Sequence, residues 1–353
     1  MTPSMWQQRV KEGEIFQDVE GRGLVFAGLD LSGGVFSRVD FSGADFRGAQ
    51  LDEAVFAECN LQGATFAGAS MVRAMTHDSD LSDADYGGTD LRTASFVTCN
   101  AVRTNFSGAC VEHTVFTQSE LNGSCLRFAR ADHPYFVDCR LADADFAQTV
   151  LTGALFQGLD LRRVNFEGVR FDNGIFNDAN LADQNLAGQS FTMSQFSGAD
   201  LSRCRFTHAV LTQCNFAGAV MHGVNLDGAC AQQALFNKAD LSGASARGLT
   251  ALQSIWVDAI ADDLDLSDAV LQQSIWHRAR GRGMVLARAE LTYADFSYAD
   301  LSQARFDGAH FSRTKFHRAV SDRPAWVHQP GVLENDPALF EAELWDAAKR
   351  AAR

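Results

Sequence analysis

A large apolar residue recurs at every fifth position of this chain and continues, without a break, for most of its length. Within residues 44–70 the series is Phe46, Leu51, Phe56, Leu61 and Phe66. A small residue, mostly alanine, stands two positions before each of these centres. A period of five fits neither an α-helix, whose period is 3.6, nor a strand, whose period is 2. Followed in steps of five, the frame runs from Phe16 to Phe316 and gives 61 pentapeptides without an insertion.

The pentapeptides share a consensus of a small residue, a polar residue and a central Phe or Leu, as in ADFRG, CNLQG, ADLSR and ADFSY. This pattern resembles the pentapeptide repeat family, whose motif is A-(D/N)-L-x-x or its Phe variant. The resemblance covers about 300 residues. It implies an all-β fold, a right-handed quadrilateral β-helix in which each pentapeptide forms one side and four pentapeptides form a coil.

The sequence itself supports a coil of twenty residues, because positions twenty apart share their character. The series 16, 36, 56 and onward to 316 contains sixteen centres, of which thirteen are Phe; the exceptions are Thr76, Trp256 and Trp276. We therefore expect about 15 coils and, at a strand spacing of ~4.8 Å, a tube about 70 Å long. Stacked aromatic rings should fill its interior.

The ends of the chain depart from the repeat, which predicts three segments. Residues 1–15 should form a capping helix, with Thr2 as N-cap and Pro3 in the first turn. Residues 16–321 should form the solenoid, and residues 322–353 a linker followed by a second helix. Apolar residues of this C-terminal helix, namely Phe340, Leu344 and Trp345, should either cap the tube or form a dimer contact.

Composition argues against several classes of partner and location. The formal net charge of −14 disfavours binding to nucleic acid or to an anionic membrane. No apolar run approaches the ~20 residues that span a bilayer, and the first residues lack the apolar core of a signal peptide. We therefore expect a cytoplasmic protein that binds neither nucleic acid nor membranes.

Residues with catalytic chemistry are sparse in this sequence. The cysteines follow the frame, and those at the small inward position should pack as slightly larger alanines. Glu112, His113, Asp132 and His133 would place two carboxylates and two imidazoles in adjacent coils, which is a ligand set for a divalent metal. We interpret this group as a coincidence on a polar surface, and we expect no enzymatic activity, no cofactor and no bound metal.

The residue before each centre should point outward, and two of the resulting columns differ in chemistry. One is an acidic ladder that includes Asp40, Asp80, Glu120, Asp160 and Asp200. The other is an apolar ridge that includes Val35, Val55, Tyr135, Leu155, Ile175, Ile255 and Ile275. Strand propensity alone favours β-branched residues, but a long exposed apolar strip also indicates an interface.

These surfaces support two main hypotheses for function. The first is a non-enzymatic scaffold or adaptor that binds a partner protein, or a second copy of the chain, through the apolar side or the C-terminal helix. Similar repeat proteins also occur as accessory components of bacterial secretion machines, which the resemblance makes a candidate role. The alternative is a DNA mimic that binds and modulates DNA gyrase or topoisomerase, as some pentapeptide proteins do.

Charge distribution bears on the choice between these hypotheses. Residues 16–160 hold 20 acidic residues against 9 arginines, a net charge of −11, which suits a DNA mimic. Residues 161–321 hold 16 acidic against 15 basic residues, a net charge of −1, which does not. The apolar ridge also favours the scaffold. A metal-dependent enzyme at the Glu112–His133 group is a third hypothesis.

Overall fold

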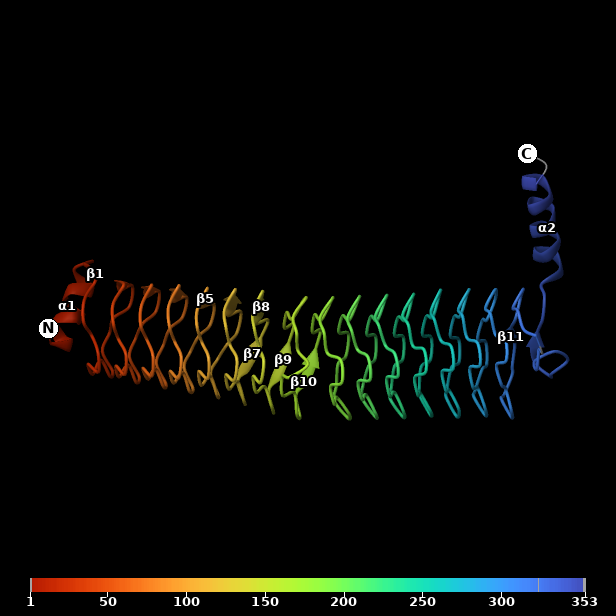
Figure 1. The fold of residues 1–353 in the computed structure, drawn as a ribbon, viewed down its shortest axis with the longest axis horizontal. Helices are drawn as coiled ribbons and strands as arrows, with labels where there is room; N and C mark the ends of the chain where they lie inside the picture. Colours follow the sequence, from red (N-terminus) through yellow and green to blue (C-terminus); the bar gives the residue numbers. More distant parts are fainter. Residues whose placement is uncertain (1, 323, 352–353) are drawn as a thin grey trace. The chain divides into compact units, whose positions relative to one another are not determined.

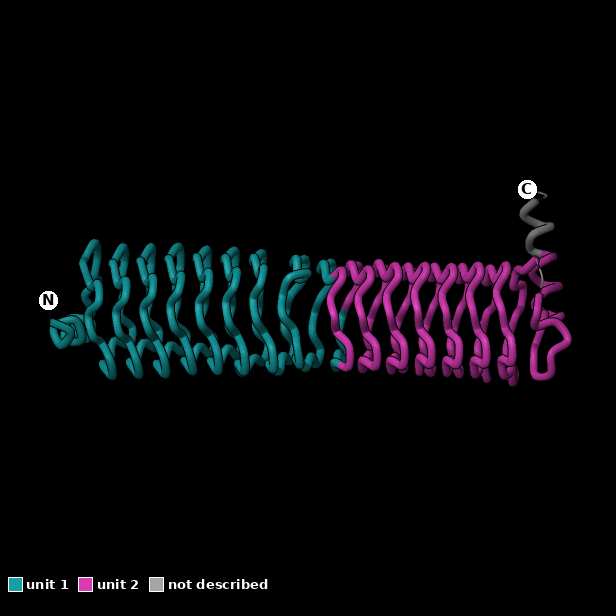
Figure 2. The backbone as a smooth tube through the Cα atoms, turned by 60° about the horizontal axis from the view of Figure 1, so that its bottom comes forward, with its two compact units in different colours: residues 1–181, 189–195 teal, residues 182–188, 196–353 magenta. Residues whose placement is uncertain are grey.

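The computed structural model describes residues 2–322 and 324–351, and the chain divides into two compact units. Unit 1 contains residues 1–181 and 189–195, and unit 2 contains residues 182–188 and 196–353 (Figure 2). Successive coils of parallel strands and bridges build each unit, and the two helices of the described residues lie near the chain ends (Figure 1). The predicted fold class, a quadrilateral β-helix with short terminal helices, is confirmed.

Unit 1 begins with helix α1 (Pro3–Lys11) and carries two parallel sheets. The larger sheet contains β1 (Ile15–Gln17), β2 (Val35–Ser37), β3 (Val55–Ala57), β4 (Met75–His77), β5 (Ser95–Val97), β6 (Val115–Thr117) and β8 (Tyr135–Val137). The smaller sheet contains β7 (Arg130–Asp132), β9 (Val150–Thr152) and β10 (Arg170–Asp172). The two sheets lie on adjacent sides of the coils, which we call side 1 and side 4.

Unit 2 is built mainly from isolated bridges, one on each side of a coil. Its strands and helix are β11 (Thr314–Lys315), β12 (Val332–Leu333) and α2 (Pro337–Ala351). Of the two described helices, neither is long and apolar enough to cross a membrane.

The register of both units follows the twenty-residue coil. Phe36 lies opposite Phe56 in the sheet of unit 1, and Ile255 lies opposite Ile275 in unit 2. Every pentapeptide centre therefore faces the centre twenty residues later, and the side chains form continuous columns along each unit. This agrees with the coil length that the Phe series predicts.

Aromatic rings fill the interior of side 1 as parallel stacks. In unit 1 the centroid of the Phe156 ring lies 5.1 Å from that of Phe136 and 5.4 Å from that of Phe176, with interplanar angles of 8° and 9°. In unit 2 the Phe216 ring stacks on Phe236 at 5.0 Å. These phenylalanines are fully buried or nearly so, so each ring contributes both buried apolar area and ring-to-ring contact.

The corner after side 1 is open in most of the described coils of unit 1, which means that the backbone N–H three residues after the centre does not bond to the centre's carbonyl. In the described residues of this unit, no backbone hydrogen bond closes the corners that follow β1 to β6 and β8. At four of these corners the side chain three residues after the centre, from Cys59, Cys99, Ser119 or Cys139, reaches the centre's carbonyl in the preceding coil. The Cys99 thiol donates to the Thr76 carbonyl at 3.4 Å, and the Ser119 hydroxyl donates to that of Phe96 at 3.2 Å. The Ser119 oxygen also accepts the Cys99 backbone N–H at 3.0 Å.

Burial keeps the thiols of this column protonated, as donors must be. Removal from water raises the pKa of Cys59 to about 11, that of Cys99 to about 12 and that of Cys139 to about 11. The sequence prediction that these cysteines pack inward is confirmed by their burial. They also donate hydrogen bonds, which an alanine cannot do.

The same corner is closed in unit 2, where alanine takes the position of the cysteines and serines. The backbone N–H of Ala239 donates to the Phe236 carbonyl at 3.1 Å, and that of Ala259 to the Trp256 carbonyl at 3.1 Å. A β-turn therefore replaces the last strand residue. Side 1 consequently carries three-residue strands in most of unit 1 and single-residue bridges in unit 2 before β11.

A tryptophan covers the aromatic column at each end. In unit 1 the Trp6 ring of α1 stacks on Phe16 at 4.2 Å and is fully buried. In unit 2 the Trp326 ring stacks on Phe316 at 4.6 Å. Strand β12 then pairs with β11, so residues after 321 add a partial coil before α2 begins.

Candidate binding surfaces

The apolar ridge of unit 1 lies on side 1, on the seven-stranded sheet as far as Tyr135 and on isolated bridges at Leu155 and Ile175. Its members from Ile15 to Ile175 pair in register with the residues one coil away, and Ser95 interrupts the series. Ile15 and Met75 are exposed, whereas Val35, Val55, Val115, Tyr135, Leu155 and Ile175 are half-buried. Each side chain in the column is partly covered by the side chains one coil before and after it. The part that stays exposed forms a narrow apolar strip.

Open corners widen this surface in unit 1. Because the strand continues one residue past the buried centre, that residue also points outward, and Val97 and Val137 are half-buried there. Both border the ridge near Val115 and Tyr135. The sequence analysis missed them, since it assigned outward positions only before the centres; β-branched residues after a Phe centre were the available signal.

The ridge residues of unit 2 form a separate, shorter column. Leu235, Ile255 and Ile275 pair in series, and the polar residues Asn215 and Asp295 flank them. Beyond Asp295 the tail lies over side 1 and encloses a groove of about 640 Å³. Its lining includes His277, Lys315, Leu333 and Leu339.

Polar and aromatic contacts hold the start of α2 against the last coils of unit 2. Glu343 accepts a hydrogen bond from the Tyr298 hydroxyl, which lowers the pKa of that carboxyl, and pairs with Arg318. The Arg318 guanidinium also lies 4.7 Å from the centroid of Phe340. Phe340 thus packs on the solenoid, whereas Leu344 and Trp345 are exposed by 51% and 66%.

The acidic ladder has a structural use in the corners. Its aspartates accept the backbone N–H two residues later, as Asp80 does from Ser82 at 2.9 Å and Asp200 from Ser202 at 3.0 Å. Arginine neutralises others: the Arg162 side chain bonds to Asp160 at 2.7 Å and lowers the pKa of that carboxyl. Asp40 likewise accepts the Ser42 backbone N–H and pairs with Arg22, whereas Glu120 accepts a hydrogen bond from the side-chain amide of Asn122.

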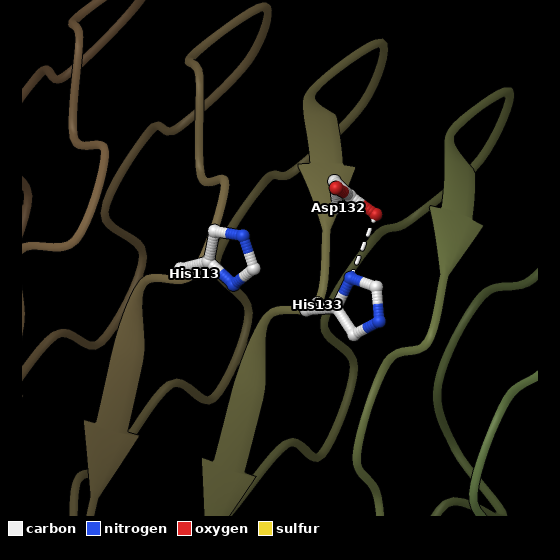
Figure 3. Close-up of side chains that lie close together, drawn as sticks. All are labelled: His113, Asp132 and His133. Atoms are coloured by element: carbon white, nitrogen blue, oxygen red, sulfur yellow. Dashed lines mark hydrogen bonds and ion pairs between the residues drawn. The ribbon is translucent and has the colours of Figure 1, made fainter.

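Three of the four predicted metal-ligand candidates come together at a corner of unit 1. His113, Asp132 and His133 offer ligand atoms that all lie within 4.8 Å of one another (Figure 3). Asp132 Oδ1 lies 2.8 Å from His133 Nδ1, and the two imidazoles stack with centroids 5.3 Å apart. Glu112 stands outside this group and lines a shallow hollow of about 480 Å³ on side 4, together with Phe128, Val150 and Asp132 itself.

Comparison with known proteins agrees with the repeat. The family model for pentapeptide repeats matches eight stretches of the chain: residues 22–56, 49–85, 77–118, 139–178, 165–203, 204–243, 265–297 and 294–320. The search of curated proteins found no match.

Several solved structures are similar in part. A trypsin-treated form of QnrB1, described as a plasmid-mediated fluoroquinolone resistance protein, is 16% identical, covers 65% of this chain and 91% of its own, and has a TM-score of 0.26. HetL from the cyanobacterium Nostoc sp., a pentapeptide repeat protein involved in heterocyst differentiation regulation, is 19% identical, with coverage of 89% and 96% and a TM-score of 0.14. Rfr23 from the cyanobacterium Cyanothece is 15% identical, with coverage of 49% and 91% and a TM-score of 0.17.

Proposed function

The chain belongs to the pentapeptide repeat family, and from that premise we propose that it is a non-enzymatic scaffold that binds a partner protein along the apolar ridge of unit 1. The observation that carries this proposal is the in-register apolar column, which lies on the seven-stranded sheet and continues beyond it through the bridges at Leu155 and Ile175. Tyr135, Leu155 and Ile175 form the last uninterrupted part of this column, beside the additional valine Val137.

The physical basis is burial of preorganised apolar surface. Side-chain stacking within the column and the rigid sheet behind it reduce the entropy lost when a partner binds. Each Å² of apolar area removed from water contributes about 25 cal/mol before the costs of association. The ridge also contains an aromatic residue, Tyr135, and aromatic residues are typical of interface anchors.

Introduction of charge into the ridge tests the proposal. The triple variant Tyr135→Lys, Leu155→Lys, Ile175→Lys should fold, because these side chains point away from the core, and should lose the partners that the wild type retains from lysate of its native cell. If the partner is a second copy, light scattering should show a fall from dimer to monomer. Unchanged partners and unchanged mass would refute the ridge as the binding surface.

A matched control places the same three charges on other parts of unit 1. Gln50→Lys, Thr65→Lys and Gln148→Lys lie away from side 1, at outward or corner positions of sides 3 and 4. This variant should retain the wild-type partners and mass. The identity of the retained proteins also tests the narrower proposal that the partner belongs to a bacterial secretion machine.

A DNA mimic that modulates gyrase is the second candidate, and the net charge of −11 in residues 16–160 favours it. Against it, the ladder carboxylates are partly occupied by backbone N–H groups and arginines. Purified protein in a gyrase supercoiling assay separates the two candidates. Inhibition that persists in the Lys triple variant would support the mimic and oppose the scaffold.

A further inference from the structure

We propose that His113, His133 and Asp132 bind one divalent transition-metal cation, such as Zn²⁺ or Ni²⁺, at a corner of unit 1 (Figure 3). Imidazole nitrogen and carboxylate oxygen are the ligands that these ions accept in proteins. The proposal reverses the expectation from the sequence, which treated the group as a coincidence. The structure changes that assessment because it shows how the three side chains are brought together.

The backbone places the two imidazoles one above the other. His113 and His133 occupy the same corner position in successive coils, with φ values of 53° and 47°. Their rings stack with an interplanar angle of 17°. The next residue in this column is Gly153, where a Cβ atom would lie 2.5 Å from the His133 ring. The glycine therefore provides the space in which that ring lies.

Pro134 suits the open corner that carries the carboxylate, and the next two corners of this side, before Ala154 and Gly174, are open as well. Proline has no backbone N–H, so the corner after Ala131 cannot close as a hydrogen-bonded turn. The chain instead continues as strand β7 through Asp132, which turns that side chain outward beside His133. An ion held between His133 Nδ1 and Asp132 Oδ1, which lie 2.8 Å apart, would replace the proton that these two atoms otherwise share.

The three ligand atoms can reach one ion through rotation of their side chains, without movement of the backbone. Ligand atoms about 2.0–2.1 Å from a tetrahedral ion lie about 3.4 Å from one another, compared with the 4.8 Å limit found here. Because an imidazole lone pair lies in the ring plane, one stacked ring must also turn to share the ion. The His133 and Asp132 side chains are 46% and 50% exposed, which leaves room for this rotation. Water would complete the coordination.

Isothermal titration calorimetry of untagged protein with ZnCl₂ tests the metal site. The result does not depend on whether a partner protein binds the apolar ridge. The wild type should bind one Zn²⁺, and the double variant His113→Gln, His133→Gln should lose that binding. Glutamine is chosen because Gln213, Gln233, Gln253 and Gln273 occupy this corner column in unit 2 with φ values of 56–59°. Asp132→Asn, which keeps the shape and removes the charge, should weaken binding by about 10–100-fold.

His208→Gln serves as the matched control. His208 has the same type of corner conformation (φ 59°), and its ring lies over Gly228 as that of His133 lies over Gly153. Its neighbours in the column are Gly188 and Gly228, so it has no stacked imidazole there. Zinc binding should be unchanged in this variant. Absence of 1:1 binding in the wild type, or equal binding in the double variant with a native circular dichroism spectrum, would overturn the proposal.

Discussion

Unit 1 and unit 2 share a column of stacked aromatic rings on side 1, yet they turn the following corner differently. From residue 59 to residue 139 the position three after the ring alternates between Cys and Ser, and the corner is open. From residue 199 to residue 319 the same position is always Ala, and the corner is closed. Cys and Ser offer the centre's carbonyl a side-chain donor in place of the backbone N–H. In these coils the residue at this position correlates with the backbone path: the corner is open where it is Cys or Ser and closed where it is Ala.

This difference changes the surface as well as the turn. An open corner keeps the residue after the ring in the strand, so two outward side chains flank each buried ring. A closed corner places that residue in a turn, as at Asn237 and Val257. The broader side 1 of unit 1 thus accompanies its open corners, which occur at Val19 and Val39 as well as along the Cys and Ser column, and it is this side that carries the longer apolar ridge.

The comparison first predicts that the aromatic core is equivalent in the two units. Phe156→Ala in unit 1 and Phe216→Ala in unit 2 should each lower the free energy of unfolding by about 3–5 kcal/mol, since both rings are fully buried within a stack. Denaturant unfolding of the two variants measures this. A loss below about 1 kcal/mol for either would contradict the column assignment.

A second prediction concerns the open corner itself. Ser119→Ala removes the donor to the Phe96 carbonyl and the acceptor for the Cys99 N–H, so it should cost about 1–3 kcal/mol of unfolding free energy. Ser297→Ala in unit 2, where the hydroxyl bonds only to the half-buried Asp295 carboxylate, should cost less. Equal losses at the two positions would mean that the Ser column does not hold the open corner.

The buried thiols predict a third, pH-dependent difference. The folded pKa of Cys99 is about 12, raised by burial, so above the unfolded value of about 8.5 only the unfolded chain ionises. The stability is therefore intact below about pH 8.5 and falls as the pH rises toward 12, by about 1.4 kcal/mol per pH unit for this thiol. Cys99→Ser, which copies its neighbours in the column, should flatten that slope between pH 9 and 11.

The smallest effect is expected at the corner column that carries the histidines in unit 1 and glutamines in unit 2. The exposed amide of Gln233 bonds to Gln213 and Gln253. Gln233→Asn keeps the amide but shortens its reach, and should change the unfolding free energy by no more than about 0.5 kcal/mol. A larger loss in denaturant unfolding would show that the amide ladder stabilises unit 2.

Much of the fold could be predicted because the pentapeptide frame determines which residues face inward. The Phe series gave the coil length, and the observed register agrees with it. The corner geometry was not predicted, although the switch from Cys and Ser to Ala was visible. At this corner the centre's carbonyl accepts either the backbone N–H three residues later or a side-chain donor from the next coil. The outcome depends on residues in two coils, so a single pentapeptide does not determine it.

The candidate site was predicted in part for a similar reason. The twenty-residue spacing brought His113 and His133 together correctly. The open corner that turns Asp132 outward was not predicted, although Pro134, which has no N–H to close it, lies beside the histidines. Trp326 keeps the five-residue frame ten positions after Phe316, but it lies in a segment that reads as a linker. The stacking of Trp326 on Phe316 depends on the path by which the tail returns to the last coil. That path is a tertiary feature, which the residues next to Trp326 do not predict.

The tryptophans at the two ends of the aromatic column have a consequence for assembly. A parallel coil leaves a row of unpaired N–H and C=O groups at each terminus, and such edges can template the addition of another chain. Trp6 with α1 in unit 1, and Trp326 with β12 in unit 2, occupy those termini. Covered termini disfavour the head-to-tail addition of a second chain. A chain without these two residues would therefore be prone to polymerise into filaments.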